Sequence, residues 1–212
     1  MRDYIIVALI GYLSGNIQSA YLLGKLVKKV DIRTLGQGNA GASNALVSLG
    51  WKFGVVVALI DILKGIFAVL FVKYLFSVGF NKEGALLLYT AGYFAILGHI
   101  YPFFMNFKGG KGTATLIGML LGMNPLYGII AMFIIAGVTF ASDYIAIGTL
   151  SLLLYILFMT IFKDFGAGPV ILTILGGLLS VKLHLPNFKR ILNGQETKLS
   201  TVLHRKKAPD VK

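Results

Sequence analysis

The stretch Phe53–Phe76 reads FGVVVALIDILKGIFAVLFVKYLF and decides the class of fold. Its 24 residues exceed the about 20 that an α-helix needs to cross the hydrocarbon core of a bilayer. Asp61 and Lys64 lie three positions apart inside it, so a helix places them on one face. Charges at membrane depth are costly unless they pair and face the protein interior. The stretch therefore predicts a transmembrane helix with an internal ion pair of structural or supporting role, and Gly65 permits close packing beside it.

The rest of the chain repeats this pattern. Of 212 residues, 57% are hydrophobic and only 13% are charged, which is typical of repeated membrane spans. The seven apolar stretches are Tyr4–Leu26, Phe53–Phe76, Gly84–Met105, Thr113–Met123, Leu126–Ala141, Ile145–Phe162 and Ala167–Leu183. We therefore predict an all-α integral membrane protein, a seven-transmembrane-helix bundle. Residues 1–200 are expected to form a single polytopic membrane domain, followed by a basic cytoplasmic tail over 201–212.

Two of the apolar stretches have features of their own. Thr113–Met123 is too short to cross about 30 Å of hydrocarbon unaided, so it is either a half-helix or a helix packed against thinned or occupied membrane. The first stretch carries small and polar residues that favour close helix packing, so this face should look into the bundle. These residues are Ser14, Gly15, Asn16, Gln18 and Ser19.

The positive charges predict the topology. The net charge is +12, and the cations gather in three segments between or after the apolar stretches. They are Lys28, Lys29, Arg33 and Lys52, then Lys108 and Lys111, then Lys189, Arg190, Lys198, Arg205, Lys206 and Lys207. Seven crossings place all three segments on the cytoplasmic face, as the positive-inside rule requires. The charge therefore indicates topology and attraction to anionic lipid, and we expect no nucleic-acid partner.

Residue usage excludes several kinds of chemistry. The chain has no cysteine, which rules out a thioester on the enzyme, a thiolate metal site and a disulfide framework. Its three histidines and eight carboxylates form no cluster along the sequence, so we expect no metal site. No cofactor is implied by any motif.

The first segment that could carry chemistry is Asp31–Asn44, DIRTLGQGNAGASN. Its glycines allow successive backbone N–H groups to turn toward one point and form an anion site. A helix that begins near Ser43 would aim its positive end at the same place. The alternative is an ordinary glycine-rich loop between helices. The candidate phosphate-binding residues are Arg33, Gly36, Gln37, Gly38, Asn39, Gly41, Ser43 and Asn44.

The second segment is Gly98–Thr113, GHIYPFFMNFKGGKGT. Two lysines flank a pair of glycines directly before a short helix, and this pattern suits a phosphate group. It is not a Walker A loop, because the order is Gly-Lys-Gly-Thr and no strand precedes it. The alternatives are that the lysines only mark the inner face and that His99 is an ordinary interfacial residue. The candidates are Lys108, Gly109 and Gly110 for binding, and His99 and Lys111 for catalysis.

The third segment is His184–Lys198, HLPNFKRILNGQETK. His184, Asn187 and Arg190 lie three positions apart, so one helical turn would place them on one face. Taken alone, this segment is also typical of a basic helix on the lipid surface. Together, the three segments suit polyanionic small molecules bound beside an apolar bundle.

The three segments resemble the signature motifs of the PlsY family, the bacterial acyl-phosphate:glycerol-3-phosphate acyltransferases. The matching residues are Asp31-Ile-Arg33, Gly36-x-Gly38-Asn39-x-Gly41-Ala42, Asn44, Asp61-x-x-Lys64-Gly65, Gly98-His99, Pro102, Phe107-Lys-Gly-Gly-Lys-Gly112, His184-x-x-Asn187-x-x-Arg190, Gly194, Glu196 and Lys198. The likeness covers nearly the whole chain in the right order. This chain departs from the family at Gln37, where Ser is usual, at Val47, where Arg is usual, and more mildly at Ser43, where Thr is usual.

The resemblance implies a fold, an activity and a location. It implies a phospholipid-synthesis enzyme of the bacterial cytoplasmic (inner) membrane that transfers an acyl group from acyl phosphate to the sn-1 hydroxyl of glycerol 3-phosphate. His99, Lys111 and Asn187 would be catalytic, with His184, Arg190 and Glu196 in substrate binding. Partners would be the two substrates, membrane lipid and other phospholipid-synthesis enzymes. No His-x4-Asp motif of the other large glycerolipid acyltransferase class is present.

Two other functions stay open at this point. A catalytically degenerate member could serve as a lipid-binding partner, and the residues that favour this reading are Gln37 and Val47. A small-anion transporter or channel could use the same glycine and lysine loops. Against the transporter, the glycine-rich segments are expected at one membrane face rather than at the midplane, and no inverted repeat is visible.

Overall fold

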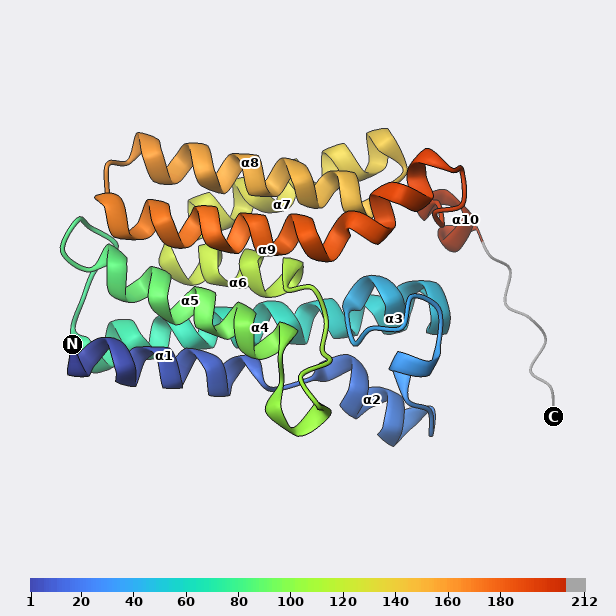
Figure 1. Cartoon of the computed structure of the whole chain (residues 1–212), viewed down its shortest axis with the longest axis horizontal. Coiled ribbons are helices and arrows are strands. Elements are labelled where there is room, and N and C mark those ends of the chain that lie inside the picture. Colours follow the sequence, from blue (N-terminus) through green and yellow to red (C-terminus); the bar gives the residue numbers. More distant parts are fainter. Residues whose placement is uncertain (205–212) are drawn as a thin grey trace.

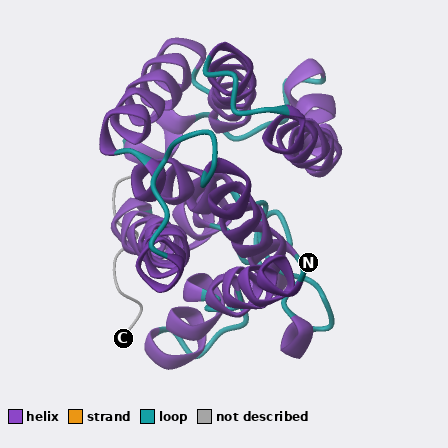
Figure 2. Ribbon diagram, turned by 90° about the vertical axis from the view of Figure 1, so that its left-hand side faces the viewer, coloured by secondary structure: helices purple, strands orange, loops and turns teal. Residues whose placement is uncertain are grey.

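The structure, a computed structural model, describes residues 1–204, and all regular elements in this range are helices (Figures 1 and 2). They are α1 Arg2–Gly15, α2 Ser19–Val27, α3 Ala42–Leu49, α4 Trp51–Phe76, α5 Ala85–Ile100, α6 Thr113–Met123, α7 Pro125–Ser142, α8 Ile145–Phe162, α9 Ala167–Leu192 and α10 Leu199–Leu203, with 3-10 turns at Ile32–Thr34 and Phe103–Met105. Within this range, 6 segments are long and apolar enough to cross a membrane. The prediction of an all-α membrane protein is confirmed.

The predicted boundaries differ from the structure at the C-terminal end. We expected the last span to stop at Leu183, but α9 continues to Leu192. Pro186 lies inside it, although an interior proline removes one backbone hydrogen bond from a helix. Beyond α9, the short helix α10 crosses the predicted start of the tail at residue 201. The remainder of the predicted tail, 205–212, lies outside the described residues.

Glycines set how closely the helices pack. A Cβ on Gly15 of α1 would lie 2.0 Å from the carbonyl oxygen of Ala95, and one on Gly98 of α5 would lie 2.1 Å from that of Tyr12. Any side chain at either position would force α1 and α5 apart. The same holds for α4 and α6, since a Cβ on Gly65 would lie 2.4 Å from the carbonyl oxygen of Thr115. The packing role predicted for Gly65 is confirmed.

Helix α6 lies in the middle of the bundle and is shorter than its neighbours (Figure 1). It has 11 residues, most of them buried. The ammonium group of Lys73 on α4 donates to the carbonyl oxygen of Met123, the last residue of α6, over 2.6 Å. Asn124 then caps α7 by accepting from the backbone N–H of Leu126. These polar contacts allow a helix to end inside an apolar bundle.

The first span is broken between α1 and α2. The backbone carbonyl of Ile17 in this break accepts from Lys64 over 2.6 Å. The side-chain amide of Gln18 donates to the carbonyl oxygen of His99 over 3.1 Å. The polar residues around the break, Ser14, Asn16, Gln18 and Ser19, are all buried. The prediction that this face looks into the bundle is therefore confirmed.

Candidate active site

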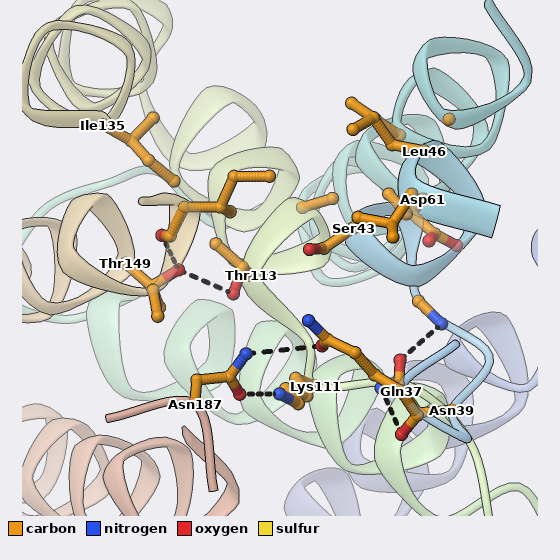
Figure 3. A pocket seen from close by; sticks show the side chains of 18 of the residues that line it. Gln37, Asn39, Ser43, Leu46, Asp61, Lys111, Thr113, Ile135, Thr149 and Asn187 are labelled. Carbon is orange, nitrogen blue, oxygen red and sulfur yellow. Dashed lines mark hydrogen bonds between the residues drawn. The ribbon is translucent and has the colours of Figure 1, made fainter. Parts of the chain in front are cut away.

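A pocket of about 240 Å³ lies where the three sequence segments meet. Residues of all three segments line its polar part, among them Gln37, Lys111 and Asn187 (Figure 3). Apolar side chains from α3, α4, α6, α7 and α8 line the rest. These include Leu46, Val55, Ile117, Ile135 and Ile145. The pocket therefore joins a polar end to an apolar end.

The first glycine loop is built around Asn44. Its side-chain oxygen accepts from the backbone N–H of Gln37 over 2.7 Å, and its amide group donates to the carbonyl oxygens of Ile32, Leu35 and Asn39. Gly36 has a left-handed φ of +52°, and a Cβ there would lie 2.4 Å from the Asn44 oxygen. Helix α3 begins directly after this loop, as predicted. Asn44 is fully buried, so it holds the backbone of the loop in place and is not itself exposed to a ligand.

The second loop packs against the first. The backbone N–H of Ala40 donates to the carbonyl oxygen of Gly109 over 3.0 Å. Gly110 lies against the imidazole of His99, where a Cβ would stand only 2.1 Å from Nε2. Any larger residue at 110 would collide with that ring. The two glycine-rich segments are thus one structural unit.

The two lysines of the second loop lie in different environments. Lys111 lines the pocket and donates to the side-chain oxygen of Asn187. Lys108 is exposed and does not line the pocket. The reason is a tight turn in which Asn106 and Phe107 have φ of +53° and +58°. This turn directs Lys108 to the surface.

The third segment closes the polar end of the pocket from α9. His184 and Asn187 lie on the buried face of the helix. Glu196 accepts from Gln37 Nε2 over 2.8 Å, from Asn187 Nδ2 over 3.0 Å and from Arg190 Nε over 2.6 Å. His184 and Asn187 therefore turn toward the pocket, and Arg190, one turn further along, reaches Glu196 beside it.

The charges around the pocket act on Lys111. Burial lowers the pKa of the Lys111 ammonium to about 8, and the positive charge of Arg190 lowers it in the same direction. Glu196 opposes both effects. Lys111 therefore changes charge near physiological pH.

Arg33 does not reach the pocket. Its guanidinium pairs with Asp31 over 2.8 Å and donates to the carbonyl oxygen of Met105 over 3.1 Å. The hydrogen bonds from Arg33 hold the pKa of the Asp31 carboxyl below its usual range. This pair ties the first loop to the second.

A second polar cluster lies beneath the loops, inside the bundle. The ammonium group of Lys64 lies 2.8 Å from Asp61 Oδ1, 2.6 Å from the carbonyl oxygen of Ile17 and 2.8 Å from His99 Nδ1. An ammonium group only donates, so Nδ1 of His99 accepts and Nε2 carries the ring proton. His99 therefore presents a hydrogen-bond donor toward Gly110. The predicted ion pair between Asp61 and Lys64 is confirmed.

This arrangement of motifs in a bundle matches a known family. The family model described as "Glycerol-3-phosphate acyltransferase" matches residues 5–194. The chain belongs to the glycerol-3-phosphate acyltransferase family. Glycerol-3-phosphate acyltransferase 1 of Oceanobacillus iheyensis is 40% identical over 96% of this chain and 98% of its own length. The enzyme of the same name from Thermoanaerobacter pseudethanolicus is 38% identical over 92% of this chain and 95% of its own.

Two solved structures have the same fold. The crystal structure of PlsY (YgiH), an integral membrane glycerol 3-phosphate acyltransferase, in its glycerol 3-phosphate form superposes with a TM-score of 0.84. It is 30% identical and covers 95% of this chain and 99% of its own. The lysphosphatidic acid form gives a TM-score of 0.80 at 27% identity. The resemblance, the membrane fold and the prediction of an acyltransferase of phospholipid synthesis are confirmed, which disfavours the transporter reading.

The structure sorts all but one of the predicted site residues into two groups. Those that line the pocket are Gln37, Asn39, Gly41, Ser43, Asp61, His99, Lys111, His184, Asn187 and Glu196. Those that hold these in place are Arg33, Gly36, Gly38, Asn44, Lys64, Gly109, Gly110 and Arg190. Lys108 belongs to neither group. Residues 1–204 bring no three His, Cys, Asp or Glu side chains together as a metal site.

Sequence reasoning missed part of the pocket wall. Thr113 and Thr149 both line it, with their hydroxyl oxygens 3.4 Å apart (Figure 3). Leu199 and Val202 of α10 also border it. Thr149 lies in an unbroken apolar stretch, so its sequence offered no signal. Thr113 follows the lysine-glycine segment directly, and this adjacency was the only pointer to it.

Proposed function

We propose that this protein transfers a fatty acyl group from acyl phosphate to the sn-1 hydroxyl of glycerol 3-phosphate. The products are 1-acylglycerol 3-phosphate and inorganic phosphate. The observation that carries this proposal is the hydrogen bond between Lys111 and Asn187 at the boundary between the polar and apolar parts of one pocket. Such a boundary suits a donor that has a phosphate at one end and a hydrocarbon chain at the other. The two PlsY structures are named for glycerol 3-phosphate and for lysphosphatidic acid, which supports this substrate class.

The reaction is one exchange of bonds at the acyl carbonyl. The hydroxyl oxygen of glycerol 3-phosphate forms the new ester bond to the carbonyl carbon, and the bond from that carbon to the phosphate oxygen breaks. Phosphate leaves with the electron pair. Acyl phosphate is already activated, so the protein's task is to bring two phosphate-bearing molecules together and to offset their charge.

The residues divide this work. Lys111 neutralises negative charge that develops on the carbonyl or the leaving phosphate. Asn187, held by Lys111 and Glu196, orients the carbonyl. Backbone N–H groups of the first glycine loop receive a phosphate, with the N-terminus of α3 behind them. Arg190 pairs with Glu196, which also bonds Asn187, and so adds positive charge beside Asn187.

The hydroxyl proton goes to a substrate phosphate. His99 was the best titratable candidate for a base, but its Nδ1 accepts from Lys64 and its Nε2 carries the ring proton. A protonated ring nitrogen cannot accept the hydroxyl proton. The acyl phosphate itself brings phosphate oxygens to the reacting carbonyl, and one of them accepts the proton. We therefore assign His99 the task of holding the Gly110 loop.

We also propose seven crossings, in which α6 is a short crossing inside the bundle. With seven crossings the three basic segments, and with them the pocket mouth, face the cytoplasm of a bacterium, and the protein lies in its inner membrane. Residues 1–200 then form one membrane domain. Because the chain has no cysteine, single cysteines at Lys82 and at Lys189 can be labelled with a membrane-impermeant reagent. Labelling of both from the same side would contradict this topology.

The direct test is phosphate release by the purified protein in detergent or lipid. We expect release that requires both acyl phosphate and glycerol 3-phosphate and yields lysophosphatidic acid. Release without glycerol 3-phosphate would identify a hydrolase. No release from folded protein would favour the catalytically degenerate reading, which restoring Gln37→Ser and Val47→Arg would then examine.

A further inference from the structure

The last helix of the described chain forms part of the pocket. Helix α10 spans Leu199–Leu203, and its Leu199 and Val202 side chains border the cavity. Val202 is only 6% exposed although it lies near the end of the described residues. Ile145 and Thr149 of α8, close after Asp143 in the chain, line the same cavity. The apolar face of α10 therefore covers the apolar end of the pocket.

A helix of five residues does not hold its place by itself, because helix nucleation is unfavourable. Helix α10 is held by Asp143 in the connection between α7 and α8. The backbone oxygen of Asp143 accepts from the N–H of Leu199 over 2.9 Å. Its carboxylate accepts from the N–H of Ser200 over 2.7 Å and from the Ser200 hydroxyl over 2.5 Å. These contacts satisfy the N–H groups that the first turn of a helix leaves free.

The conformation and charge of Asp143 suit this role. Its φ is +66°, a left-handed value that ends α7 and turns the residue toward α10. The hydrogen bonds from Ser200 hold the pKa of the Asp143 carboxyl below its usual range, and the positive charge of Lys198 acts in the same direction. The carboxylate therefore stays ionised, and accepts both bonds, across the neutral pH range.

We propose that Asp143 is a positioning residue that holds α10 as a wall of the acyl-chain part of the pocket, and thereby sets the affinity for the acyl donor. This inference rests on the proposed function. Leu199 and Val202 offer hydrocarbon contacts, which only the acyl chain can use. The printed polar contacts of the pocket join Gln37, Lys111, Asn187 and Glu196, none of which belongs to α10. Loss of the Asp143 contacts should therefore weaken binding of acyl phosphate and leave binding of glycerol 3-phosphate unchanged.

The test is the variant Asp143→Gly, because glycine accepts the left-handed φ and removes the side chain while the backbone carbonyl that accepts from Leu199 remains. We expect the KM for acyl phosphate to rise about tenfold while kcat and the KM for glycerol 3-phosphate stay unchanged, the pattern of lost ground-state binding. Ser200→Ala removes one of the two carboxylate contacts and should give a smaller change in the same direction. Amide hydrogen exchange at Leu199 and Ser200 should accelerate in Asp143→Gly.

Asp164→Gly is the matched control. Asp164 also has a left-handed φ, +49°, and lies at the opposite end of α8, where it forms an exposed ion pair with Lys82 over 3.1 Å. The Asp164→Gly variant should leave both KM values and the amide hydrogen exchange of α10 unchanged. If Asp143→Gly releases α10 but leaves the KM for acyl phosphate unchanged, the inference is wrong and the proposed function stands.

A second variant keeps the fold and changes only the surface that α10 offers. Val202→Thr has nearly the same shape and places a hydroxyl against the acyl chain. It should raise the KM for long-chain acyl phosphates more than for short-chain ones. Equal effects on all chain lengths would contradict contact between Val202 and the chain. Absence of turnover in the unmodified protein would overturn the proposed function, and this inference with it.

Discussion

The molecule contains two polar clusters built on lysine, and they differ in what the lysine meets. Lys64 lies in the bundle interior, where its ammonium group contacts Ile17, Asp61 and His99. Among the described residues, Lys111 has one hydrogen-bond partner, Asn187, and it lines the pocket. A lysine with three partners has no N–H left for a substrate, whereas Lys111 has two. Although Asp61 and His99 also line the pocket, we therefore propose that the enclosed cluster around Lys64 holds the loops in position and that the open cluster around Lys111 serves the reaction.

The largest expected effect comes from breaking the enclosed cluster. Lys64→Met leaves the Asp61 carboxylate buried without its counter-charge, and loss of one partner of a buried pair costs about 3 to 5 kcal/mol of folding stability. Unfolding in detergent measures this loss. The double variant Asp61→Asn/Lys64→Met should lose less stability than the two single variants summed. Additive losses would show that the pair does not act as one unit.

The open cluster should respond in activity rather than in stability. Lys111→Met is expected to lower kcat/KM about 100-fold or more, the size found when a group that stabilises the transition state is removed. The unfolding transition should stay near that of the unmodified protein. Lys108→Met, three residues away on the surface, should stay within about threefold of normal activity. Equal losses in both variants would contradict the distinction between the two lysines.

The pH dependence of the reaction tests whether the Lys111 ammonium group takes part in it. The pKa of Lys111 lies at about 8, lowered by burial and by Arg190. If the ammonium form is required, kcat/KM falls about tenfold per pH unit above that value, since this parameter reports the free enzyme. Arg190→Gln removes a charge that lowers the pKa, so the fall should move to higher pH. A profile flat to pH 10 would exclude the Lys111 ammonium from the reaction.

The smallest effect is expected at Gln37. Its side chain donates to Glu196 and accepts from Asn187 over 3.3 Å, so it links the first loop to α9. Gln37→Ala removes both bonds and should lower kcat/KM about three- to tenfold, as expected for about 1 kcal/mol. Gln37→Ser should fall between Ala and the unmodified protein. A fall in kcat/KM as large as that of Lys111→Met would show that Gln37 contributes to the reaction as directly as Lys111 does.

Local chemistry made much of the fold and site predictable. The span over Phe53–Phe76, the ion pair inside it and the packing role of Gly65 all follow from the cost of burying charge and the small size of glycine. The start of α3 and α6 directly after glycine-rich loops also follows from residue type. The convergence of the three segments could be predicted because the positive-inside rule expects their positive charges on one side of the membrane.

Other features depend on geometry that residue types do not specify. Lys108 and Lys111 have the same chemistry, and only the left-handed turn at Asn106 and Phe107 separates them. The last apolar stretch ends at Leu183 because polar and basic residues follow it, but the helical turn expected over residues 184–190 is a direct continuation of α9. The contact between Asp143 and Ser200 joins residues 57 positions apart, so no local pattern announces it.

The short central helix has a consequence for how two immiscible substrates meet. Helix α6, with 11 residues, is about 16 Å long, roughly half the hydrocarbon thickness that the surrounding helices are long enough to cross. The long outer helices thus match the full thickness of the bilayer, while the short helix α6 leaves a thinner apolar layer in the middle of the bundle. A water-soluble phosphate ester can descend to the reaction centre without entering lipid. In the proposed reaction, the hydrocarbon chain lies along the apolar lining of the pocket that α6 borders.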